Sequence, residues 1–122
     1  MDSTAPSIKL EHADARGEIY SIALPDNREL MLIHSAPGAF RGGHSHDCHE
    51  VVTLLSGKMR YHKLTQVATI GPGDSSFNRR GEIHMGEFLE DTWLVEYKLA
   101  QKDAWTQTDY EPMREMVRAS QR

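Results

Sequence analysis

The sequence predicts an all-β domain, either a sandwich or a barrel, followed by one short C-terminal helix. Apolar or alternating runs of four to eight residues recur along the 122-residue chain, and turn residues such as Pro25-Asp26-Asn27 separate them. Short β-rich runs at a spacing of roughly 8–12 residues are typical of sandwiches and barrels. No helical pattern of about ten residues or more lies between them, which disfavours a parallel α/β sheet.

The predicted elements follow one another without a linker or an internal repeat. Strands are expected over 18–24, 29–35, 51–55, 58–64, 66–70, 75–78, 83–89 and 92–99. Met113, Met116 and Val117 then recur at helical spacing, with Asp109 as the expected N-cap and Pro112 in the first turn. We therefore predict one domain over 1–122, with a barrel over about 15–100 and an outer helix over about 109–119.

Composition and charge limit the classes of binding partner and the cellular compartment that we expect for this protein. The chain is 39% hydrophobic and 26% charged, an ordinary globular balance, and no apolar run is long enough to span a membrane. A net charge of −4 disfavours nucleic acid. The first seven residues have no basic or apolar signal region, so a cytoplasmic protein is expected. Cys48, the single cysteine, cannot form an intrachain disulfide and is predicted to be a buried thiol rather than a neighbour of a metal site.

Most of the candidate metal ligands lie in a histidine-rich segment within 38–57. Side chains two residues apart on a strand share a face, so His44 and His46 can converge on one ion. Glu50 has the same parity if the strand resumes in register, whereas His49 has the opposite parity and is expected to face outward unless a bulge intervenes. His84, after the turn residue Gly81, is the expected fourth ligand from a neighbouring strand. Imidazole and carboxylate donors together suit one divalent Fe, Mn, Ni, Co or Zn ion, with open positions left for a substrate or O₂.

These residues resemble the cupin motifs. The first motif, G-x5-H-x-H-x3-E-x6-G, is matched at every defined position, by Gly38, His44, His46, Glu50 and Gly57. The second motif, G-x5-P-x-G-x2-H-x3-N, is matched by Gly73, Gly81 and His84. It departs at two positions, where Arg79 replaces the proline and Phe88 replaces the asparagine. The resemblance implies a double-stranded β-helix, or jelly-roll barrel, and a homodimer that exchanges or pairs N-terminal strands.

A second resemblance concerns the sugar-nucleotide cupins, the dTDP-sugar epimerases and 3,4-ketoisomerases. Asp14-Ala15-Arg16-Gly17 and the segment from Arg41 to His46 are similar to that group. This resemblance implies Arg41 as the phosphate contact and His44 or His46 as a base. A histidine that coordinates a metal cannot also be a free base, so the two interpretations compete for the same residues.

Three functions remain open at the level of sequence. The first is a metal-dependent enzyme acting on a small molecule, a dioxygenase or a metal-assisted isomerase, lyase or decarboxylase. The second is the metal-free sugar-nucleotide isomerase or epimerase, with Arg41 and His46 active, and the third is a non-catalytic ligand-binding or sensor barrel. Tyr61 is a candidate catalytic residue, and together with His62, Glu96 and Tyr97 it is also a candidate hydrogen-bond partner of a ligand imidazole.

Overall fold

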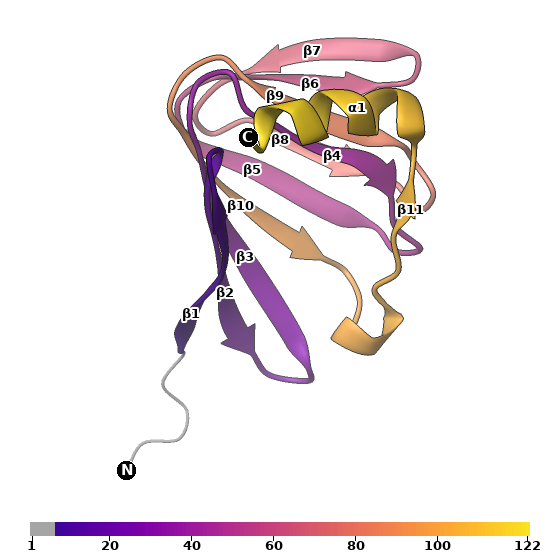
Figure 1. The fold of residues 1–122 in the computed structure, drawn as a ribbon. Helices are drawn as coiled ribbons and strands as arrows, with labels where there is room; N and C mark the ends of the chain where they lie inside the picture. The colour runs from indigo at the N-terminus through magenta and orange to yellow at the C-terminus, as the bar shows by residue number, and fades with distance from the viewer. Residues whose placement is uncertain (1–6) are drawn as a thin grey trace.

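Two antiparallel sheets face each other and form the body of the protein (Figure 1). The computed structural model describes residues 7–122; the predicted absence of an N-terminal signal region concerns Met1 to Pro6, which lie outside them. The described strands are β1 (Ile8–Asp14), β2 (Gly17–Leu24), β3 (Arg28–Ser35), β4 (Phe40–Ser45), β5 (Glu50–Ser56), β6 (Met59–Lys63), β7 (Gln66–Ile70), β8 (Ser75–Asn78), β9 (His84–Phe88), β10 (Thr92–Lys98) and β11 (Thr108–Asp109). A 3₁₀ turn (Lys102–Ala104) and the helix α1 (Glu111–Ser120) complete the chain.

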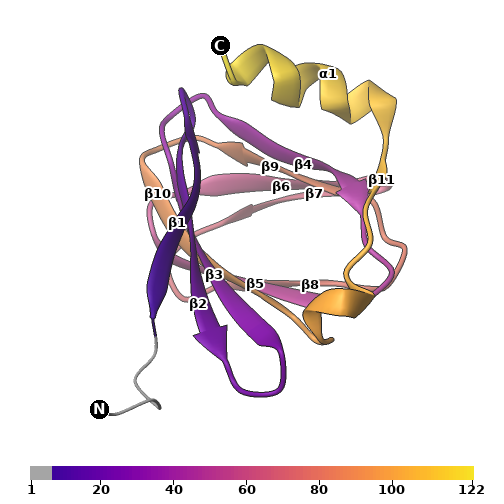
Figure 2. The same cartoon turned by 60° about the horizontal axis from the view of Figure 1, so that its bottom comes forward.

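The strand order confirms the predicted jelly-roll architecture. The six-stranded sheet runs β1-β2-β3-β10-β5-β8 and the five-stranded sheet runs β11-β4-β9-β6-β7, so chain neighbours β4 and β5 belong to opposite sheets. Figure 2 shows the two sheets as the walls of one barrel. Any segment that crosses from one wall to the other can therefore direct side chains into the space between them.

Alternation along the strands fills that space with apolar side chains. The buried core cluster takes residues from both sheets: Ile33, Ala39, Val52, Leu54, Met59, Tyr61, Phe88 and Leu94. On β10 the inward positions change from apolar Leu94 to charged Glu96 and Lys98, which line a cavity instead of the core. The sheets thus enclose a packed core and, against it, a polar cavity.

The ends of the chain differ from the prediction. β1 lies before the predicted barrel start, because its residues are exposed on an edge strand and their pattern gives no sign of a buried face. Asp109 is not the N-cap: it pairs with β4 in β11, and Tyr110 caps α1 without a side-chain bond. On the helix Val117 is fully buried, as predicted, but Met116 is 45% exposed.

Helix α1 lies alongside β4 (Figure 2). The hydroxyl of Ser120, at its end, accepts a hydrogen bond from the backbone N–H of Phe40 at 3.0 Å. Gly43 packs against it so closely that a Cβ would lie 3.2 Å from the Cδ of Arg114. The C-terminal segment is therefore part of the wall of the barrel. Among the described residues, no helix has the length and apolar character needed to cross a membrane.

Candidate metal centre

Three imidazoles meet inside the barrel. His44 is on β4, His46 immediately follows that strand, and His84 begins β9. Each offers one potential ligand atom, and these atoms all lie within 4.8 Å of one another. His46 and His84 are buried, at 8% and 5% exposure, and His44 is partly buried. The structure thus brings together three of the four residues that the sequence predicts as ligands.

Strand pairing brings the histidines together. β4 and β9 are antiparallel neighbours, and His44 lies directly opposite His84 in their register. The register shifts between Gly42 and His44, where Gly42 and Gly43 have φ values of 92° and 75°. Such a bulge re-aims the side chains that follow it. The two glycines therefore set the direction in which His44 points.

Gly42→Ala should destabilise the protein by about 2–4 kcal/mol, the sum of left-handed backbone strain and a steric clash. A Cβ at this position would lie 2.9 Å from the carbonyl oxygen of His84. Urea unfolding measures the effect. Gly71→Ala is the control, because a Cβ there meets no atom within 4 Å and the φ angle is not positive. Equal stability of the two variants would contradict the role given to Gly42.

Glu50 lies beside the three histidines, by another route than the one expected, and does not belong to the group whose ligand atoms all lie within 4.8 Å of one another. We expected the strand of His46 to resume in register, but β4 ends at Ser45 and Glu50 opens β5 in the opposite sheet. Its side chain is fully buried, and its Oε1 lies 3.0 Å from the Nε2 of His84. Its Oε2 is 3.9 Å from the Nε2 of His46. His49 is exposed, and its Nδ1 accepts the backbone N–H of Arg80.

Backbone carbonyls orient two of the imidazoles. The Nδ1 of His46 lies 2.9 Å from the carbonyl oxygen of Thr106, and that of His84 lies 3.0 Å from the carbonyl oxygen of Glu82. A carbonyl can only accept, so each Nδ1 carries the proton and donates it. The Nε2 of a neutral ring then keeps a lone pair for an ion, which is the arrangement typical of metal-ligating histidines; at His84 this requires loss of the proton shared with Glu50.

The ligand atoms of the three histidines lie close enough together to share an ion, and Glu50 lies beside one of them. Neighbouring ligands at about 2.1 Å from one metal lie about 3 Å apart at right angles, which is the separation of Glu50 Oε1 and His84 Nε2. The Nδ1 of His44 is buried without a hydrogen-bond partner among the described residues. Three imidazoles and a carboxylate suit a divalent transition metal. The three histidines therefore fit a divalent metal, and Glu50 stays a predicted fourth ligand.

Burial and charge set the protonation of these groups. Burial, together with the neighbouring His46, lowers the pKa of His44 to about 3. Burial also lowers the pKa of His46. For His84 burial acts in the same direction, but the hydrogen bond to Glu50 outweighs it and raises the pKa. Without a metal, His44 and His46 are thus neutral, and a proton between His84 and Glu50 holds that pair together.

Sequence reasoning missed two residues beside Glu50. The Nζ of Lys98 lies 3.4 Å from Glu50 Oε2 and 2.7 Å from Glu96 Oε1. The amide of Asn78 donates to Glu50 Oε1 at 2.8 Å and to the hydroxyl of Tyr61 at 2.6 Å. The inward parity of Lys98 with Leu94 on β10 was the available signal. The sequence analysis includes Lys98 in the strand predicted over 92–99 and gives it no role.

A cavity of about 420 Å³ connects the histidines to other predicted residues. Arg41, Tyr61 and Glu96 line it together with His44, His46 and His84. His62 and Tyr97 do not line it: His62 is paired with Glu87 at 2.8 Å, and Tyr97 accepts a hydrogen bond from Arg28. None of the four expected partners hydrogen-bonds an imidazole of the cluster: backbone carbonyls of Thr106 and Glu82 accept from His46 and His84, and the Nδ1 of His44 has no partner among the described residues.

Cys48 is a free, buried thiol, as predicted, and does not belong to the cluster of three histidines. Its exposure is 8%. Burial raises the pKa of its thiol, so it stays protonated and is a poor metal ligand near neutral pH.

The fold and the site together define a class: a single jelly-roll barrel with an inward cluster of three histidines, which is the cupin fold. No protein-family model matches the sequence, and no curated protein matches it. Solved structures match the fold at low sequence identity. KdgF from Halomonas sp. is 15% identical with a TM-score of 0.67, over 78% of this chain and 89% of that one.

Two further structures give the same result. An RmlC-like cupin from Shewanella frigidimarina is 17% identical with a TM-score of 0.68, over 78% of this chain and 86% of that one. A chain from the structures of the DMSP lyases RdDddP and RnDddQII is 18% identical with a TM-score of 0.66, over 84% of this chain and 62% of that one. The likeness is one of fold.

Proposed function

We propose that this protein is a metal-dependent enzyme that moves a proton on a small oxygen-bearing molecule, as an isomerase or a lyase does. His44, His46, Glu50 and His84 would hold one divalent transition metal. The observation that carries the proposal is the orientation of the imidazoles: two of them donate Nδ1–H to backbone carbonyls, so their Nε2 atoms face the cluster. When bound, the ion would act as a Lewis acid on an oxygen of the substrate.

Proton-carrying groups beside the cluster favour isomerase or lyase chemistry over oxygen chemistry. Glu96 and Lys98 form a close pair that lines the cavity, and burial raises the pKa of Glu96. Tyr61 accepts a hydrogen bond from Asn78, which leaves its own proton free to be donated. A carboxylate base and a hydroxyl acid in one cavity are what removal and return of a proton require. One of the similar structures belongs to the DMSP lyases, which agrees with this chemistry.

The two alternative functions, a sugar-nucleotide isomerase and a binding or sensor barrel, account for fewer of these side chains. A sugar-nucleotide isomerase needs one histidine as a free base, whereas here three imidazoles converge within 4.8 Å. A binding or sensor barrel has no need of the Glu96–Lys98 pair or of Tyr61 in the cavity. Turnover of a candidate substrate separates an enzyme from a binding protein.

The test is metal binding by protein purified without a histidine tag. Elemental analysis should find about one Fe, Mn, Ni, Co or Zn ion per chain. Because the pKa of His84 is raised, metal affinity should begin to fall above the ordinary histidine value of about 6.5 as the pH decreases. Since His44 and His46 are already neutral, binding should release about one proton rather than three. Calorimetry in buffers of different ionisation enthalpy counts the protons. Protein that binds none of these metals would contradict the proposal.

A further inference from the structure

The outward side chains of the six-stranded sheet form two uncharged rows. Antiparallel register places one residue of each strand in a row across the sheet. The Tyr97 row is apolar or aromatic on every strand and runs, in sheet order, Ile8, Ile22, Leu30, Tyr97, Val51, Phe77. The Leu32 row beside it runs Leu10, Tyr20, Leu32, Val95, Thr53, Ser75. We call the two rows together the outer face.

The outer face points away from the interior of the barrel. The chain neighbours of these residues, such as Ile33, Val52 and Leu94, lie in the buried core, and side chains alternate between the two faces of a strand. All members of both rows are partly or largely exposed. Helix α1 packs on β4 of the other sheet (Figure 2). In the described part of the chain, the helix therefore leaves the outer face uncovered.

The outward side of the five-stranded sheet is built differently. There Arg60 and His62 on β6 both pair with Glu87 on β9, at 3.1 Å and 2.8 Å. A sheet with one face in water alternates apolar and polar residues in this way, whereas strands covered on both faces are apolar on both. The outer face of the six-stranded sheet has the second pattern, and a contiguous exposed apolar patch marks an interaction site.

Charged side chains begin where the two rows end. Beyond the Leu32 row, His34 lies between Glu18 at 3.1 Å and Asp91 at 2.8 Å. Beyond the Tyr97 row, Arg28 donates a hydrogen bond to the hydroxyl of Tyr97 at 3.0 Å. A centre without charges that contains aromatic side chains, surrounded by a polar rim, is the usual composition of a protein–protein interface.

The sheet that carries the outer face is large enough for a stable dimer. Six strands about 4.8 Å apart span about 24 Å, and strands of seven or eight residues at about 3.3 Å per residue are about 25 Å long. The projected area is therefore about 600 Å² per copy, or about 1,200 Å² for two copies, and a specific interface needs about 1,000 Å² in total.

We propose that two copies of this chain form a homodimer by packing the outer faces of their six-stranded sheets against each other. Each copy has a net charge of −4, so two copies repel unless they meet where neither is charged, as along these rows. Two sheets of the same twist pack face to face at about 30°. This arrangement differs from the exchange or pairing of N-terminal strands that the cupin resemblance implies, and it does not depend on a metal.

Light scattering coupled to size-exclusion chromatography of the full-length protein tests the inference. The wild type should have twice the chain mass of 13.8 kDa. Leu32→Glu places a carboxylate in the middle of the outer face, opposite Val95, where the dimer would bury it without a partner. This variant should weaken the dimer about 100-fold or more. Val67→Glu is the matched control: Val67 is 55% exposed on β7 of the other sheet, so this variant should stay dimeric.

Circular dichroism checks that Leu32→Glu is folded. If it is not, Phe77→Glu takes its place, because Phe77 is 46% exposed and a monomer would keep the new charge in water. A monomeric wild type would overturn the inference. A folded outer-face variant that dimerises as tightly as the wild type would also overturn it, in favour of paired N-terminal strands. Equal weakening by Val67→Glu would overturn it as well, because the interface would then not be confined to the outer face.

Discussion

His84→Ala should lower the affinity for a divalent transition metal by about 100-fold or more, since even loss of a residue that only orients a ligand costs about 10- to 100-fold. His84 is at the centre of the candidate site: its Nε2 lies 3.0 Å from Glu50, and its Nδ1 donates to a carbonyl that fixes the ring. The alanine variant removes one donor from the set and leaves the other side chains in place. Elemental analysis and competition with a chromogenic chelator measure the loss.

The barrel should stay folded in this variant, because ligands on a strand scaffold that is already formed add more to metal affinity than to folding. Glu50 keeps Asn78 and Lys98 as partners. His49→Ala is the control: this histidine lies in the same segment but is exposed and outside the cluster, so metal affinity should not change. Unfolding of metal-free His84→Ala at room temperature, seen by circular dichroism, would show that the site is structural instead.

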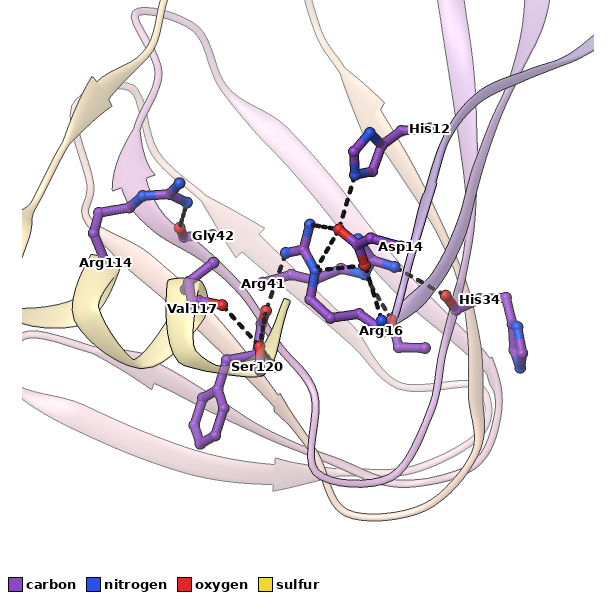
Figure 3. Close-up of polar contacts among 11 residues, drawn as sticks. His12, Asp14, Arg16, His34, Arg41, Gly42, Arg114, Val117 and Ser120 are labelled. Carbon is purple, nitrogen blue, oxygen red and sulfur yellow. Dashed lines mark hydrogen bonds and ion pairs between the residues drawn. The ribbon is translucent and has the colours of Figure 1, made fainter. Parts of the chain in front are cut away.

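Asp14→Ala should cost about 3–4 kcal/mol of unfolding free energy, the range for breaking a buried ion pair by removing one partner. Asp14 holds the guanidinium of Arg16, whose side chain is 7% exposed, and accepts the backbone N–H of the same residue (Figure 3). Without this carboxylate, Arg16 would face Arg41 with no negative charge between them. Urea unfolding measures the loss.

The contribution of Asp14 should also depend on pH. The hydrogen bonds from Arg16 lower the pKa of Asp14 below its ordinary value. The stabilisation is thus complete above the unfolded-state value of about 4 and is lost as the pH falls through the lower folded-state value. The difference between wild type and variant should shrink in that acidic range. Glu111→Ala, which removes an exposed carboxylate paired with Arg118, is the control and should cost at most about 1 kcal/mol. Equal losses for the two variants would contradict the role of Asp14.

The alternating strands and the spacing of the histidine segment could be predicted without coordinates. Alternation of side chains at a period of two is a local property, so strands such as 66–70 and 92–99 appear in the sequence at nearly the bounds the structure gives. The inward direction of His44, His46 and Glu50, and the outward direction of His49, also followed from parity. For Glu50 the predicted inward direction is correct but the argument behind it is wrong. Residue parity applies along one continuous strand, whereas the chain crosses to the opposite sheet between His46 and Glu50.

Only the tertiary structure decided what surrounds those ligands. Lys98 and Asn78 approach Glu50 from other strands, and Thr106 reaches His46 from a loop 60 residues away. The hydrogen bonds of Arg41 to Ser35 and to the carbonyl of His34 are likewise invisible in the sequence, since they depend on the packing of β4 against another strand. Local periodicity determines the direction of a side chain from its own strand, whereas its partners are set by long-range pairing and by the cost of burying charge, which depend on the whole fold.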